Sequence, residues 1–301
     1  VPAAVAPTES DAVITIRNGH TVTINTAKTI DQVVVNSGGA LHAFAFVTIA
    51  NGPGNDLVNN GTVFFSSFGG VLNVVSGAFI SGSSAIQFDG NCINNGTINV
   101  QLIAWGTGAQ IMEGDGVING LTIANPLTIS GSQTVTGILS FSNGNITTID
   151  TSKIIVAASG SVQNNSGTDW FVNGNLQMNF GSGTGTKSFR VGDGAGFRPV
   201  DVTVFNSLGN GGVTISTSNP DHPSIATSDI DPTKSVNRYW SVEVAVGNTN
   251  VWTTFNWLPG EVDGGANTNN FVVREYNGSN WSIASIISQT ATSARVQTVS
   301  N

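Results

Sequence analysis

The chain has 301 residues, which is enough for about two domains or for one long repetitive domain. Charged residues make up only 9% of it, hydrophobic residues 39%, and Gly occurs 37 times. The scarcity of charge excludes helical bundles and salt-bridged α/β enzymes, and the apolar content excludes a disordered chain.

The formal net charge of -8 comes without any basic run, so we expect no nucleic-acid partner and no binding to anionic membrane surfaces. No apolar stretch reaches the length of about 18 residues that a membrane span needs, so none is expected. The single Cys92 has no second cysteine or histidine beside it, which favours a buried small side chain over a disulfide or a metal ligand.

Residues 1–10 are predicted to form an extended arm that is apolar and contains prolines. Proline prevents this arm from being a central strand but lets it lie along a neighbouring molecule. We therefore expect it to contact an adjacent copy of the chain and so to build a head-to-tail homopolymer. The alternatives are that it caps the first coil of its own chain, Ala12 to Arg17, or is disordered. The expected contact residues are Val1, Pro2, Val5 and Pro7.

Residues 11–180 consist of short β-rich runs separated by Gly with Asn or Ser, at a mean spacing of about 19 residues. Similar short motifs recur at the turns, such as Asn59-Asn60-Gly61-Thr62 and Asn94-Asn95-Gly96-Thr97. A repeat of this length predicts a parallel β-helix, or β-solenoid, of about nine coils. A set of antiparallel sandwiches is the alternative that short strands and glycine turns also allow.

Seven phenylalanines of this region are expected to point inward and to stack from coil to coil, because aromatic side chains bury large apolar areas. The alternative is an exposed aromatic strip that binds sugar or another partner. The set consists of Phe44, Phe46, Phe64, Phe65, Phe68, Phe79 and Phe88.

Near residue 181 charged residues and tryptophans become more frequent, with Trp240, Trp252, Trp257 and Trp281 in the remainder of the chain. About eight longer, alternating strands predict that residues 181–301 form an antiparallel β-sandwich, Ig-like or jelly-roll-like. The glycine-rich stretch 181–186 is the expected hinge between the two parts. The whole chain is thus predicted to be all-β.

Several stretches are similar to a known architecture: SDAVITI, NGHTVTI and TIDQVVVNSGG near the start, KSFRVGDGAGFRPVDV from Lys187, and KSVNRYWSVEV from Lys234. They resemble secreted and cell-surface β-helix proteins of Bacteroidetes-type bacteria, which are adhesin-like and usually exported by type IX secretion. The resemblance implies a solenoid followed by a sandwich and an extracellular or cell-surface location. It carries no catalytic motif, and the sorting domain with which many such proteins end is missing after Ser285.

The acidic residues and histidines of the chain show no clear catalytic pattern. Glu113 and Asp115 are a close acidic pair expected to be a polar turn, and His20, His42 and His222 lack metal-binding spacing. Carboxylate and amide oxygens are the ligands that Ca²⁺ prefers. The candidate calcium ligands lie on one glycine-containing turn and are Glu261, Asp263, Asn267 and Asn269. The alternative is that this turn is a solvated hairpin turn without a metal. A second, weaker acidic cluster consists of Asp221, Asp229 and Asp231.

The function expected from the sequence is a non-enzymatic extracellular structural protein that assembles into a filament or surface layer. The alternative is a cell-surface adhesin or carbohydrate-binding module, in which tryptophans of the C-terminal part stack on surface glycans. A polysaccharide-degrading β-helix enzyme is the third hypothesis.

Overall fold

The computed structural model describes residues 13–66, 68–246 and 250–298. Its contacts divide the chain into two compact units, Val1–Trp170 and Phe171–Asn301. In the described part of the chain, no helix is long and apolar enough to span a bilayer. The arm residues Val1, Pro2, Val5 and Pro7 lie outside the described residues, so their role as a subunit contact stays a prediction.

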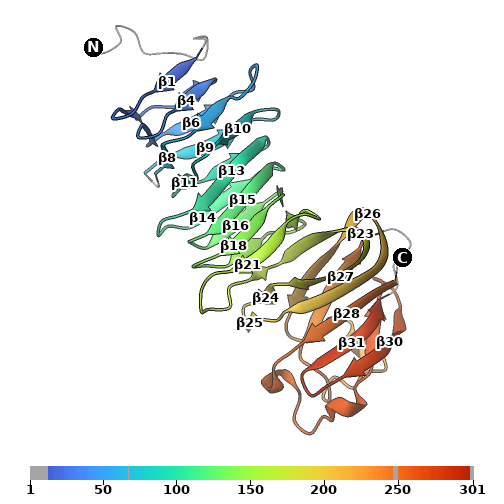
Figure 1. The fold of residues 1–301 in the computed structure, drawn as a ribbon. Helices are drawn as coiled ribbons and strands as arrows, with labels where there is room; N and C mark the ends of the chain where they lie inside the picture. The colour runs from blue at the N-terminus through green and yellow to red at the C-terminus, as the bar shows by residue number, and fades with distance from the viewer. Residues whose placement is uncertain (1–12, 67, 247–249, 299–301) are drawn as a thin grey trace. The chain divides into compact units, whose positions relative to one another are not determined.

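The first unit is a parallel β-solenoid, as the repeat predicts, and its coils follow one another in Figure 1. Each coil contributes strands to three rows. The first row is β1 (Ile14–Ile16), β4 (Val33–Val35), β7 (Leu57–Asn59), β10 (Phe79–Gly82), β13 (Thr97–Ala104), β15 (Val117–Ile123), β17 (Ser132–Val135) and β20 (Lys153–Val156). The second row is β2 (Thr21–Ile24), β5 (Ala40–Ala43), β8 (Thr62–Phe65), β11 (Ile86–Phe88), the later halves of β13 and β15, β18 (Ile138–Phe141) and β21 (Ser161–Asn164). The third row is β3 (Lys28–Ile30), β6 (Phe46–Ile49), β9 (Val71–Val74), β12 (Cys92–Asn94), β14 (Gln110–Glu113), β16 (Leu127–Ser130) and β19 (Ile146–Thr148).

The pairing register gives the length of each coil. The shortest step in the first row runs from Ile118 to Val135 and the longest from Val33 to Leu57, which are 17 and 24 residues. These steps bracket the spacing of about 19 residues seen in the turn glycines. The differences in coil length lie in the loops, because the inward-facing strand positions stay aligned from one coil to the next.

Buried side chains stack in columns along the solenoid. One column of the second row places Phe65 next to Phe88 and each of them next to an alanine, Ala43 below and Ala104 above. All four side chains are fully buried. In this column two large side chains lie between two small ones, and together they fill the interior as close-packed protein cores require.

Only two of the seven phenylalanines expected inside occupy this core, namely Phe65 and Phe88. The prediction is wrong for Phe44, Phe46 and Phe68, which are exposed, and for Phe64 and Phe79, which are half-buried. The reason is the two-residue period of a strand: side chains alternate between faces, so Phe64 and Phe65 cannot both point inward. The register selects Phe65 because it continues the buried column.

The recurring Asn-Asn-Gly motifs form corners between strands of the solenoid. The buried Asn59 side chain accepts a hydrogen bond from the Gly61 N–H and donates to the Ala85 carbonyl. Asn94 accepts in the same way from the Gly96 N–H. The φ angles of Gly61 and Gly96 are not positive, so these corners do not need glycine for a left-handed conformation. Both glycines are needed instead because a Cβ would collide with carbonyl oxygens of the preceding coil.

Cys92 lies in the third row, stacked between Leu72 and Met112, and is fully buried. Burial raises the pKa of its thiol to about 12. The thiol is therefore protonated at neutral pH, as expected for a cysteine that acts as a small apolar side chain.

The second unit is built on antiparallel strands. The long β23 (Asn175–Phe189) pairs along β26 (Val200–Ser218), and the other edge of β26 pairs with β27 (Tyr239–Val244) and β28 (Asn250–Asn256). The sheet continues from β28 to β31 (Ser293–Thr298), β30 (Trp281–Gln289) and β29 (Val273–Tyr276). Short elements complete the unit: β22 (Val172–Asn173), β24 (Val191–Asp193), β25 (Gly196–Phe197) and three short 3-10 helices at Ile225–Thr227, Pro259–Glu261 and Thr268–Asn270.

The stretch 181–186, expected as a hinge, lies inside β23. Likewise, β26 runs as a single strand through Gly209, Gly211 and Gly212. The register between β23 and β26 shifts near Phe180 and Gly183. Glycines in this hairpin thus serve as bulges within paired strands, a role that local sequence does not distinguish from a turn.

The inward column provides a direct test of the solenoid register. We expect Phe65→Ala to lower the free energy of unfolding by about 3 to 5 kcal/mol through lost burial and a cavity. Phe64→Ala is its matched control and should cost clearly less, because the Phe64 ring is only half-buried. Urea unfolding followed by circular dichroism measures both. Equal losses from the two variants would contradict the register.

Candidate functional site

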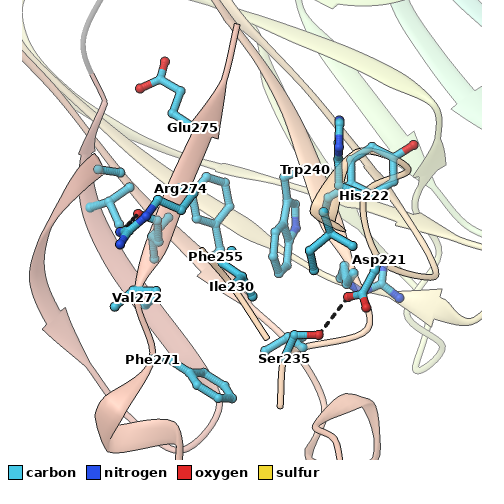
Figure 2. A pocket seen from close by; sticks show the side chains of 18 of the residues that line it. Asp221, His222, Ile230, Ser235, Trp240, Phe255, Phe271, Val272, Arg274 and Glu275 are labelled. Atoms are coloured by element: carbon cyan, nitrogen blue, oxygen red, sulfur yellow. Dashed lines mark hydrogen bonds between the residues drawn. The ribbon is translucent and has the colours of Figure 1, made fainter. Parts of the chain in front are cut away.

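A pocket of about 640 Å³ lies in the second unit. Its walls come from the loop 219–238 between β26 and β27, from the segment 265–272, and from side chains of β27 to β31. The loop is rich in Asp, Ser and Pro and folds over the sheet with only one turn of 3-10 helix. Figure 2 shows that Trp240 and Phe255 lie next to one another in this pocket, although their strands pair with opposite ends of β26.

Several aromatic rings line the pocket beside aliphatic and polar side chains. The ring centroid of His222 lies 5.0 Å from those of Tyr239 and Tyr276 and 5.1 Å from that of Trp281. Trp240 and Phe255 form a second group, with centroids 4.9 Å apart. Rings held against one another in this way present rigid apolar surfaces with polar edges.

The loop 219–238 is tied to the sheet by polar contacts. Arg274 of β29 donates two hydrogen bonds of 2.6 Å to the Asp229 carboxylate. Trp281 donates its indole N–H to the Thr227 hydroxyl at 2.9 Å. The hydrogen bonds from Arg274 lower the pKa of Asp229, so this contact is charged at neutral pH.

Asp221 is an acidic residue near the start of the loop and lines the pocket. Its carboxylate accepts a hydrogen bond of 2.9 Å from the Ser235 hydroxyl, drawn in Figure 2. Burial raises the pKa of Asp221; the Ser235 hydrogen bond acts against this, and the nearby Asp263 charge adds to it. The pocket therefore combines apolar walls with a carboxyl group that can accept hydrogen bonds.

A buried network of charges lies next to the pocket. Arg238 has a fully buried side chain and contacts both Asp193, at 2.6 Å, and Glu261. Arg198 donates one hydrogen bond of 2.8 Å to each oxygen of the Glu261 carboxylate, and Oε1 also accepts from Arg238. Burial alone would raise the pKa of Glu261, but the hydrogen bonds from Arg198 and Arg238 outweigh it and hold the pKa at about 2.

The four candidate calcium ligands have different surroundings. Both Glu261 oxygens accept arginine N–H groups, and one also accepts the Leu258 N–H. Asp263 accepts hydrogen bonds from Asn237 and Ser235, and the hydrogen bond from Asn237 is the main reason that its pKa is lowered. Asn267 accepts the N–H of Asn269 at the start of the last 3-10 helix. Calcium in this turn would thus compete with two guanidinium groups for Glu261, and the site stays a prediction.

The structure gives the other acidic candidates separate roles. Asp231 accepts hydrogen bonds from the backbone and hydroxyl of Thr233, while Asp229 pairs with Arg274. In the solenoid Asp115 accepts the Ser132 N–H, as a polar turn requires. Among the described residues, no group of three or more His, Cys, Asp or Glu side chains is placed to hold a metal ion.

The sequence does not reveal the pocket. It predicts sugar-stacking tryptophans only under the alternative of a carbohydrate-binding module; in the structure Trp240, Trp257 and Trp281 line the pocket, and Trp252 packs on Phe205. His222, whose spacing indicates no metal site, contacts Tyr276 and Trp281. The sequence does show a concentration of aromatic residues between 239 and 281. It does not show that they meet the loop 219–238, because these contacts join residues more than fifty positions apart.

Comparison with protein-family models, with curated proteins and with solved structures finds no match to this chain. The resemblance to bacterial surface proteins is therefore supported only by the solenoid itself, and the rest of it stays a prediction. The geometry of the pocket is thus the main guide to its ligand.

The buried charge network predicts a specific pH dependence. A carboxylate whose folded pKa lies below its unfolded value stabilises the fold above the unfolded pKa, and this stabilisation is lost as the pH falls. For Glu261 the loss runs from about 4.5 down to about 2. We expect Glu261→Gln to cost about 3 to 5 kcal/mol at neutral pH, because Arg198 loses its carboxylate partner and Arg238 keeps only Asp193.

The measurement is the unfolding midpoint of wild type and Glu261→Gln at several pH values. The difference between them should shrink as the pH falls through this window. The control is Asp229→Asn, which removes an arginine-paired but solvent-exposed carboxylate and should change stability little. A pH-independent difference for Glu261→Gln would contradict the network.

Calcium binding by the turn 261–269 is tested by melting the wild type with excess calcium, with excess magnesium and with a chelator. If the turn binds calcium, calcium alone should raise the melting temperature by mass action. Asp263→Asn should reduce this rise; it is preferred to Asp263→Ala because its amide oxygen can still accept the Ser235 N–H. Identical melting temperatures in all three conditions would show that this turn does not bind calcium.

Proposed function

We propose that this protein is a non-enzymatic extracellular binding protein of adhesin type, whose second unit takes a carbohydrate ring into the pocket. The observation that carries the proposal is the aromatic lining of that pocket. Sugar rings have apolar faces that stack on aromatic side chains and hydroxyl groups that pair with polar edges. A cavity of about 640 Å³ falls in the size range of ordinary small-molecule sites.

The charges of the pocket also support a neutral ligand. Arg238 and Arg274, two of its cationic side chains, are already paired with carboxylates. Lys234 donates to the Gly264 carbonyl. A phosphate or sulfate would have to displace these contacts, whereas a polyol needs only hydrogen-bonding groups such as Asp221.

In this proposal the solenoid is a structural scaffold, and the antiparallel sheet of the second unit is one layer of a β-sandwich that carries the binding site. The bacterial cell surface is the setting that the sequence resemblance implies. Assembly into a filament, which the sequence predicts, depends on arm residues outside the described part and is no part of this proposal.

The test is a glycan array probed with the full chain, followed by titration calorimetry with the glycans that bind. Phe271→Ala removes a ring from the pocket and should weaken binding at least about tenfold, or about 1.4 kcal/mol. Ile283→Ala is the matched control, because Ile283 is exposed and does not line the pocket.

Failure to bind any glycan, or equal affinity of wild type and Phe271→Ala, would overturn the proposal. Release of shorter products from a bound polysaccharide would contradict its non-enzymatic part.

A further inference from the structure

Four exposed aromatic side chains of the first unit lie along one corner of the solenoid, where the second row of strands leads into the third. This aromatic corner consists of Phe44, Phe46, Phe68 and Trp105. In the described part of the first unit, no other phenylalanine or tryptophan is exposed. Apolar side chains scattered singly over a surface need no explanation, whereas a set gathered in one place points to an interaction site.

The alignment of the coils places these rings in a line. In four successive coils, the residue that follows the second-row strand is Phe44, Ser66, Asp89 and Trp105. The backbone N–H groups of the last three each donate to a carbonyl of the preceding coil, at 2.7 to 2.9 Å. The four positions are therefore stacked, and the line covers three coil spacings of about 4.8 Å, or about 14 Å.

Phe68 lies in the tight turn that follows Ser66, and its N–H donates to the Ser66 hydroxyl at 3.3 Å. This turn lies against the coil of Phe44, because a Cβ at Gly69 would be 3.1 Å from the Phe44 carbonyl oxygen. Phe68 is 86% exposed and Trp105 is 53% exposed. Rings this open to water gain free energy from a ligand that covers them.

The charges around the aromatic corner disfavour an anionic partner. Between residues 29 and 152 the sequence has no lysine or arginine, and Asp89 lies in the line itself. A phosphate, an acidic polysaccharide or an anionic membrane would meet carboxylates without any cation to pair with. A neutral partner avoids this repulsion.

The shape of the aromatic corner suits a linear chain. A stable protein interface has a continuous apolar core within about 800 Å² of buried surface on each partner. Here the rings follow the solenoid axis and are interrupted by Ser66 and Asp89. In an extended β-1,4-linked polysaccharide, each sugar advances by nearly one coil spacing, so rings on different coils can each stack on a different sugar.

We propose that the aromatic corner binds a neutral, extended β-1,4-linked polysaccharide along the solenoid axis. Phe44, Phe68 and Trp105 stack on separate sugar rings of this chain. The site belongs to the first unit, so it goes beyond the proposed function, which uses the pocket of the second unit and treats the solenoid as a scaffold.

The test measures, by calorimetry, binding of the full chain to cello-, acetylated chito- and manno-oligosaccharides of two to six sugars. Malto-oligosaccharides, which are α-1,4-linked and curved, are the ligand control. Phe68→Ala/Trp105→Ala removes the two most exposed rings, and Phe68→Tyr/Trp105→Tyr retains both as aromatic rings. Ile138→Ala is the matched control, because Ile138 is exposed at the start of a second-row strand, away from this corner.

We expect affinity in at least one β-1,4-linked series to rise with length up to about four sugars, the length of the line. The double alanine variant should weaken binding of the longer oligosaccharides at least about tenfold, because two stacked rings are lost. Its melting temperature should stay close to that of wild type, since both side chains are exposed. The double tyrosine variant and Ile138→Ala should bind as wild type does.

The pocket variant Phe271→Ala separates the two sites. Length-dependent binding that persists in Phe271→Ala and is lost in the double alanine variant supports the aromatic corner, even if the pocket binds no sugar. Binding lost in Phe271→Ala alone would assign the sugar to the pocket, so the proposed function would stand and this inference would fail.

Three other results would also overturn the inference. They are no binding of any β-1,4-linked series, equal or tighter binding of the malto-oligosaccharides, and self-association of wild type in light scattering that the double alanine variant abolishes. The last result would identify the aromatic corner as a contact between copies of the chain.

Discussion

The structure of the first unit depends on the alignment of each coil with the one before it. Parallel pairing fixes which residue lies above which, so a single register places Phe65 over Ala43 and Phe88 over Phe65. Hydrogen bonds between coils and the burial of apolar side chains both require this register. The corner residues depend on it too, because coils this close leave no room for a Cβ at Gly61 or Gly96.

The second unit is stabilised in another way. Its sheet is interrupted by bulges and long loops, and charged side chains fill part of its interior. Arg238, Asp193 and Glu261 are held together by direct contacts in which each charge is paired. Removing the Glu261 charge would leave Arg198 without its carboxylate and Arg238 with Asp193 alone, so the network helps to fix the loop geometry around it. Arg238 itself lines the pocket, which links this network to the binding surface.

Three polar contacts hold the pocket's loop in place. Asp229 accepts from Arg274, the Thr227 hydroxyl accepts the Trp281 indole N–H, and the Ser235 hydroxyl donates to Asp221. Hydrogen bonds of this kind make a site rigid, so the aromatic rings around the pocket keep a fixed arrangement.

The sequence by itself determined the all-β class, the solenoid and its coil length, because sparse charge, frequent glycine and recurring turn motifs are local and periodic signals. It also determined that Cys92 is buried. It did not determine which phenylalanines point inward, since Phe64 and Phe65 are equally apolar and only the register of neighbouring coils separates them. Nor did it reveal the pocket, because His222, Tyr276 and Trp281 meet only through tertiary packing of residues more than fifty positions apart in the chain. Local patterns carry the period of a strand, whereas the faces and partners of its side chains are decided by what packs against them.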